Sequence, residues 1–140
     1  MEKRRKLLIR ISVFAALLGI YPLCVILFTW SNVLRSDFKG GRHGQLDAYR
    51  HVLASATVSY TLGEWAVNLV TRVFESNNKD SNRMDRHNNV IGGKIGSTVR
   101  SFRELEPAVQ QSVMKGRTDA TEPKQITWLP MAKWRDGNFW

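Results

Sequence analysis

The chain has 140 residues, which limits it to one small domain at most. A single cysteine excludes a disulfide framework, so the folded part must be held together by packing alone. The net charge is +9, but the basic residues are scattered rather than gathered in one run. This distribution argues against a nucleic-acid partner and favours a solvated surface that faces anionic lipid headgroups.

A stretch of 20 uncharged residues, Ile11–Trp30, follows a basic N-terminal flank, residues 1–10. A helix needs about 20 residues to cross a hydrocarbon core, so this stretch predicts a transmembrane helix. The flank has five basic residues and the segment after the stretch has three, which favours a cytoplasmic N-terminus. We therefore expect a single-pass anchor in a bacterial inner membrane, with the C-terminal domain in the periplasm or otherwise outside the cytoplasm. The alternatives are a cleaved signal peptide and a buried soluble helix, but the stretch is long for a signal peptide.

After the apolar stretch we expect a juxtamembrane linker, residues 31–44, and then a small helical domain, residues 45–140. Apolar residues recur at three- and four-residue steps in Gln45–Leu62, which predicts a helix with one buried face. The same pattern resumes in Glu64–Phe74, beyond Gly63. The two segments are either one bent helix or a tight hairpin.

A polar loop is expected at Glu75–Arg83, followed by a short glycine-rich helix at Val90–Val99 whose glycines favour close helix contacts. A further helix begins either at a Ser101–Glu104 capping box or near Pro107, and it ends close to Lys115.

The tail after Gly116 has no helical period, and it is too rich in large apolar side chains to remain free. We expect it to fold back over the helices. No convincing pair of strands is present. The predicted fold class is therefore all-α: one N-terminal transmembrane helix followed by a small helical domain with an irregular tail rich in tryptophan and proline.

The first segment with candidate chemistry is GQLDAYRHVLAS, Gly44–Ser55. Asp47 and His51 are four residues apart, so they share one helical face, with Arg50 beside them. An aspartate that accepts one ring N–H of a histidine leaves the other nitrogen free as a base or a ligand. An ordinary surface pair would have the same spacing.

The second segment is MDRHNNVIGG, Met84–Gly93, in which Asp85, His87, Asn88 and Asn89 stand close together. The structural alternative is an aspartate that caps a helix, followed by asparagines in a turn.

Together the two segments predict one site if the helices bring them together. The candidate catalytic residues are Asp47, Arg50, His51, Asp85, His87, Asn88 and Asn89. One use is a metal site, for a divalent metal such as zinc, with nitrogen and oxygen ligands from Asp47, His51, Asp85 and His87. The other use is metal-free acid–base chemistry, in which a histidine activates water and Arg50 or an asparagine stabilises an oxyanion or phosphate. Glu64, in a stripe with Asn68 and Arg72, could add a third carboxylate.

The paired motifs resemble an uncharacterised bacterial domain of unknown function, which has a D-A-[FY]-R-H helix and a later D-x-H-N-N-x-x-G segment. The resemblance covers roughly Gly44–Gly96. It is to domains found in envelope-associated proteins and at the ends of secreted, toxin-like proteins. It implies that the candidate residues match the family's polar pattern position by position, but it implies no reaction.

Two hypotheses of function follow. The first is a membrane-anchored hydrolase that acts on an envelope component such as a phospholipid, a lipid-linked precursor or peptidoglycan. The second is a non-catalytic envelope or assembly protein, in which the polar cluster is a structural hydrogen-bond network and the tryptophan-rich tail binds a partner. A metal-dependent nuclease is a weaker third hypothesis, because the segment lacks a ββα-type site.

Overall fold

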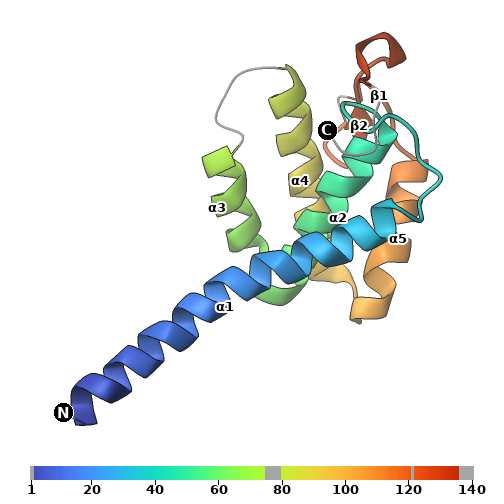
Figure 1. The fold of residues 1–140 in the computed structure, drawn as a ribbon. Helices are drawn as coiled ribbons and strands as arrows, with labels where there is room; N and C mark the ends of the chain where they lie inside the picture. The colour runs from blue at the N-terminus through green and yellow to red at the C-terminus, as the bar shows by residue number, and fades with distance from the viewer. Residues whose placement is uncertain (1, 75–79, 121, 136–140) are drawn as a thin grey trace.

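The computed structural model describes residues 2–74, 80–120 and 122–135 (Figure 1). The α-helices are α1 (Glu2–Val33), α2 (Gln45–Leu62), α3 (Glu64–Phe74), α4 (Asp80–Thr98) and α5 (Phe102–Met114). The remaining elements are a two-residue parallel pair, β1 (Arg117–Thr118) and β2 (Thr127–Trp128), and a 3₁₀ helix at Met131–Lys133. The prediction of an all-α fold is confirmed; the described residues add only this short β pair and an isolated antiparallel bridge between Arg42 and Arg135.

Helix α2 lies at the centre of the domain and contacts α1, α3, α4 and α5. Its apolar residues recur at three- and four-residue steps, which places them on shared faces of the helix. Tyr49, Val52, Leu53 and Ala56 are consequently buried, and they form the middle of the hydrophobic core. The boundaries expected for α2 and α3 match the structure, and Gly63 separates the two helices with a positive φ of 96°.

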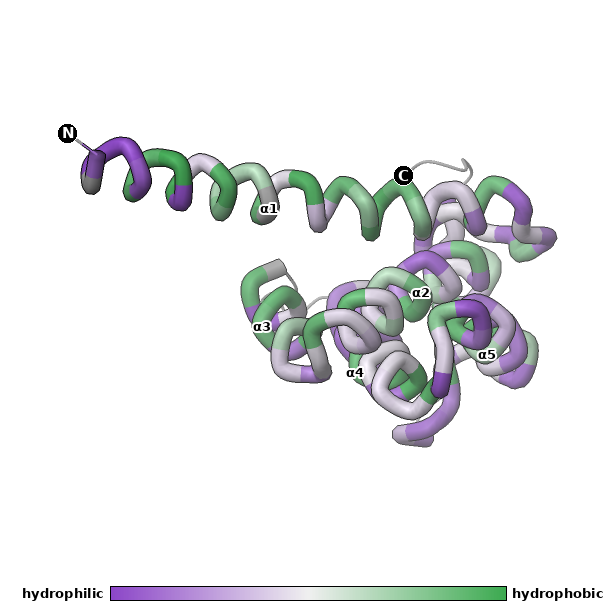
Figure 2. The backbone as a smooth tube through the Cα atoms, turned by 90° about the horizontal axis from the view of Figure 1, so that it is seen from below, coloured by the Kyte–Doolittle hydropathy of each residue, from purple (hydrophilic) through white to green (hydrophobic). Residues whose placement is uncertain are grey.

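Helix α1 is continuous from the basic N-terminus to Val33 and projects away from the domain (Figures 1 and 2). Val25, Thr29 and Val33 are buried, and their four-residue spacing places them on the face that packs against α2. The Tyr21 hydroxyl lies 2.5 Å from the Thr61 hydroxyl at the end of α2. The described side chains of α1 before Tyr21 are exposed, and the helix is long and apolar enough to cross a membrane.

Helix α4 packs against α2 at close range because of two glycines. A Cβ atom at Gly92 would lie 2.5 Å from the Val52 carbonyl oxygen, and one at Gly96 would overlap the Ala56 carbonyl oxygen. The expectation of close helix contacts at these glycines is therefore confirmed.

The expected boundary of this helix was wrong, because α4 already begins at Asp80. Residues 80–83 are helical rather than loop, and residues 75–79 lie outside the described residues. The polar residues that favour a turn by propensity are helical here, and the helix continues into a segment whose side chains have tertiary partners. Met84 is in the core, and Asn88 and Asn89 are buried and hydrogen-bonded.

Helix α5 begins at Phe102 with Ser101 at its N-cap, so the start at Ser101 rather than at Pro107 is the correct alternative. The Glu104 carboxylate accepts hydrogen bonds from the Ser101 hydroxyl and from the Arg100 N–H, at 3.0 and 3.1 Å.

The tail folds back over the helices, as expected. Ile126 and Trp128 are buried in the core, and the Trp134 ring N–H donates to the Leu129 carbonyl at 2.6 Å. Phe139 and Trp140, which the sequence also assigned to this covering, lie outside the described residues.

Candidate functional site

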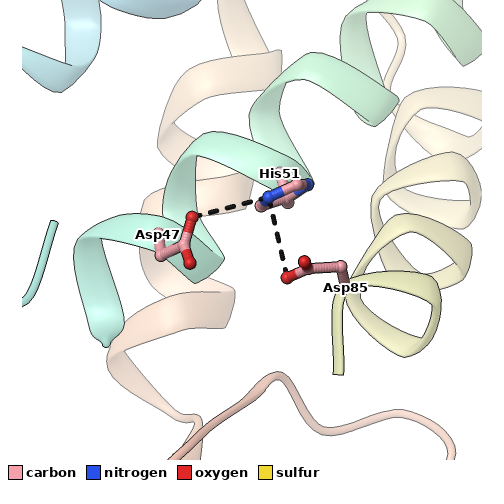
Figure 3. A group of neighbouring side chains, drawn as sticks. All are labelled: Asp47, His51 and Asp85. Carbon is pink, nitrogen blue, oxygen red and sulfur yellow. Dashed lines mark ion pairs between the residues drawn. The ribbon is translucent and has the colours of Figure 1, made fainter. Parts of the chain in front are cut away.

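Asp47 and His51 of α2 meet Asp85 of α4 at the interface of these two helices (Figure 3). His51 Nε2 lies between the two carboxylates, 3.4 Å from Asp47 Oδ1 and 3.6 Å from Asp85 Oδ1. The four-residue spacing in α2 puts the first pair on one face. The glycine contacts of α4 bring Asp85 within reach of that face.

The Asp47 carboxylate is held by groups from the preceding turn and from its own helix. The His43 backbone N–H donates to Asp47 Oδ2 at 2.6 Å, from a residue in the left-handed conformation with φ of 66°. The Arg50 guanidinium pairs with Asp47 Oδ1 and also lies over the Trp30 ring, with its carbon 5.6 Å from the ring centroid. Arg50 therefore connects the carboxylate to the end of α1.

The pKa values in this group shift in opposite directions. Burial by itself would raise the pKa of the Asp47 carboxyl, but the contact with His51 and the charges of His51 and Arg50 hold it below its ordinary value. Burial by itself would lower the pKa of His51, but the contact with Asp47 and the charges of Asp85 and Asp47 raise it. Without a metal, the arrangement therefore favours an imidazolium between carboxylates.

The same atoms form a suitable set of metal ligands. One ring nitrogen and two carboxylate oxygens lie within 4.8 Å of one another. Ligand atoms on a tetrahedral zinc ion, each at roughly 2.1 Å from the metal, are about 3.4 Å apart. The separations of His51 from Asp47 and Asp85 are close to this value. Three protein ligands leave a position for water, as catalytic zinc sites do.

His51 is the most solvent-exposed side chain of the three. The side chain of Asp47 is 3% exposed and that of Asp85 is 12% exposed, whereas that of His51 is 24% exposed. A ligand that approaches from solvent would thus meet His51 before Asp47.

His87 is not brought to this group. Its Nε2 lies 2.8 Å from the Gln125 carbonyl oxygen in the tail. Asp85 and His87 are two positions apart on a helix, so their side chains point about 200° apart. The expected metal set of two histidines and two aspartates is thereby reduced to Asp47, His51 and Asp85.

The two asparagines bind protein groups. Asn88 is fully buried; its side-chain N–H donates to the Thr127 carbonyl at 2.8 Å, and its oxygen accepts the Thr127 N–H at 3.0 Å. Asn89 accepts a hydrogen bond from the Ser55 hydroxyl at 2.8 Å and donates to the Thr71 hydroxyl at 3.3 Å. These contacts fix the tail and α3 against α4.

Glu64 also lies apart from the group, because its carboxylate accepts a hydrogen bond from the Ser97 hydroxyl at 2.6 Å. Sequence reasoning missed His43 and Trp30. His43 lies four residues before Asp47, and this spacing could have indicated that it contacts the aspartate. The contact of Trp30 with Arg50 joins segments that are distant in the sequence, so no local pattern predicts it.

Residues 17–121 match a family model described as a domain of unknown function, DUF6973. The match begins inside α1 and includes all of α2 to α5, so the second half of α1 belongs to the family's domain. No curated protein and no solved structure matches the chain. The family model covers most of the chain, and the protein therefore belongs to the DUF6973 family of domains of unknown function.

Proposed function

We propose that this protein is a membrane-anchored, metal-dependent hydrolase that acts on a component of the bacterial envelope. The observation that carries the proposal is the position of His51 Nε2 between carboxylates from two helices, at separations suited to one zinc ion. The candidate substrates are a phospholipid, a lipid-linked precursor and peptidoglycan.

Each residue of the group has a distinct role in this proposal. Asp47, His51 and Asp85 would hold the metal, which supplies an activated water at neutral pH. Arg50 and the His43 N–H keep the Asp47 carboxylate oriented. Asp85 is the more exposed carboxylate, and its second oxygen would accept the proton of the attacking water. For a lipid ester, water would add to the acyl or phosphoryl centre, the ester bond would break, and the proton held by Asp85 would pass to the leaving oxygen; for the amide bonds of peptidoglycan it would pass to the leaving nitrogen.

The anchor and its orientation are part of the proposal. Helix α1 would cross the inner membrane with its basic N-terminus in the cytoplasm, which leaves the domain in the periplasm. Protease added to intact spheroplasts should then digest the domain. Digestion only after the cells are lysed would contradict this orientation.

A second candidate function is a non-catalytic envelope or assembly protein. The hydrogen bonds of Asn88 and Asn89 to other protein groups favour it, because buried polar networks can serve structure alone. The charges of Asp47, Asp85, Arg50 and a protonated His51 would cancel, which also suits a structural network. The burial of Trp128 speaks against its direct use in binding a partner.

The full-length chain in lipid nanodiscs distinguishes the two functions. Zinc-loaded protein should release product from one of the three substrate classes, as measured by mass spectrometry. Chelation by EDTA and the substitution His51→Asn should each abolish that release. Asp119→Asn is the matched control, because Asp119 is exposed and its φ of 50° is one that asparagine tolerates. A zinc-loaded protein with no turnover of any of the three classes would favour the non-catalytic function.

A further inference from the structure

A cavity of about 200 Å³ lies beside His51, between α2, α3 and α4. Its apolar walls come from Ala54, Val58, Val67 and Val70.

The other lining residues are Ser55, Thr71 and Asn89, which are already joined by hydrogen bonds: Ser55 donates to Asn89, and Asn89 donates to Thr71. The cavity therefore offers a ligand mainly apolar contact, with the imidazole of His51 at its edge.

The size of the cavity limits what it can hold. Pockets for drug-sized ligands have volumes of about 300–1,000 Å³. A cavity of about 200 Å³ is too small for a whole sugar chain or a lipid headgroup with its substituents. It suits a segment of a single alkyl chain, whose burial is favourable at about 0.8 kcal/mol per methylene group.

The outer face of α3 leads into this cavity. Trp65, Leu69 and Val73 recur at four-residue steps and are 65%, 55% and 63% exposed. Val70 lies beside this row, is 49% exposed, and also lines the cavity. Glu64, Asn68 and Arg72 form a separate polar stripe on α3, whereas Thr71 lines the cavity. Val70 thus connects the exposed apolar row of α3 with the cavity that His51 also lines.

This face lies where α1 leaves the domain. The Tyr21 hydroxyl contacts the Thr61 hydroxyl at 2.5 Å, and α3 begins three residues after Thr61. Beyond Tyr21 the exposed part of α1 projects past the side of the domain that carries α3 (Figures 1 and 2). The apolar stretch Ile11–Trp30 continues past Tyr21 into the part of α1 that packs on α2, so a membrane crossed by this stretch would reach the junction of α2 and α3. Tryptophan is enriched at membrane–water interfaces, and Trp65 is exposed on this face.

We propose that the cavity beside His51 binds the alkyl chain of a membrane lipid, which enters from the bilayer across the apolar face of α3. This rests on the proposed function in one respect: it narrows the substrate to a lipid whose ester linkage would lie near His51. Peptidoglycan, which has no alkyl chain, is then excluded as the substrate.

The test uses the full-length protein in nanodiscs that contain a phosphatidylglycerol with a photoactivatable diazirine on its acyl chain. After irradiation, mass spectrometry locates the labelled residues. We expect adducts on the cavity walls in α2 and α3. Val70→Trp should reduce them by about tenfold, which corresponds to roughly 1.4 kcal/mol of lost affinity. Val73→Trp introduces the same side chain on the same helix but outside the cavity lining, and it should leave the labelling of the cavity unchanged.

The labelling needs neither metal nor turnover, so it is repeated with EDTA. Cavity labelling that persists in the EDTA-treated sample supports the lipid site even if the hydrolase assay fails. Labelling confined to α1 and the outer face of α3, with equal yields for both tryptophan variants, would overturn the proposal. In a parallel sample treated with a bifunctional crosslinker, links between copies of the chain through α3, without lipid adducts in the cavity, would overturn it in favour of a dimer interface.

Discussion

His51 Nε2 lies 3.6 Å from Asp85 Oδ1 although the two residues belong to different helices. Their separation is set by the approach of α2 and α4, and that approach depends on the absence of side chains at Gly92 and Gly96. The candidate site and the helix packing are therefore coupled, and a change at a glycine should affect both.

Gly92→Ala tests this coupling. The new methyl group would lie 2.5 Å from the Val52 carbonyl oxygen, so the helices must separate. We expect a loss of about 1–3 kcal/mol in the free energy of unfolding, the usual cost of overpacking. The measurement is denaturant unfolding of the full chain in detergent, followed by circular dichroism.

Gly93→Ala is the control in the same helix. Its Cβ would meet nothing closer than 3.7 Å, so the packing should not change. Alanine should then raise the free energy of unfolding by up to about 1 kcal/mol, because its helix propensity is higher than that of glycine. Equal losses of stability at Gly92 and Gly93 would contradict the account of the helix contact.

Asn88→Ala tests the attachment of the tail to α4. The substitution leaves the buried N–H and C=O of Thr127 without their partner, at a cost of about 1–3 kcal/mol for each group. We expect lower stability, a change in the fluorescence of the adjacent Trp128, and faster proteolysis of the tail. Asn82→Ala should have little effect, because the side chain of Asn82 contacts only its neighbour Ser81 among the hydrogen bonds described. An intact tail in the Asn88 variant would contradict this role.

The sequence predicts α2 and α3 well because their apolar periods are regular and local. It fails at the start of α4, where the residues favour a turn, because the contacts of Met84, Asn88 and Asn89 with distant segments have no local signal. This error also explains the misplaced His87. In a turn, Asp85 and His87 could point to one site, whereas on a helix the spacing sends them to different sides. Asp85 shares the face of Gly92 and Gly96, and so it meets α2.

The metal-free protein should show a pH dependence that reflects three pKa shifts. The lowered pKa of Asp47 gives stability that is present above its ordinary value of 3.8 and lost as the pH falls. The pKa of His43 is lowered, chiefly by burial. Its contribution to stability is therefore present above pH 6.5 and lost as the pH falls below that value. The raised pKa of His51 gives the opposite sign: its contribution is present below 6.5 and lost as the pH rises through the raised value.

The thermal midpoint of EDTA-treated protein should therefore rise towards pH 6.5 and fall above it. His51→Gln should remove the fall above pH 6.5 and leave the rise below it, since His43 is still present. A midpoint that falls equally in both proteins above pH 6.5 would show that another group is responsible.

The most direct measurement of the central claim is a calorimetric titration of the full-length, metal-free chain with zinc, in nanodiscs at pH 7.5. We expect one zinc ion to bind per chain, with proton release from His51 on binding. His51→Asn and Asp85→Asn should each lower the affinity for zinc. The loss should exceed the roughly 10–100-fold that follows when a residue behind a metal ligand is removed. Asp119→Asn should bind zinc as the unmodified chain does. Equal affinity in all four proteins, or no binding by the folded unmodified chain, would contradict a metal site at Asp47, His51 and Asp85.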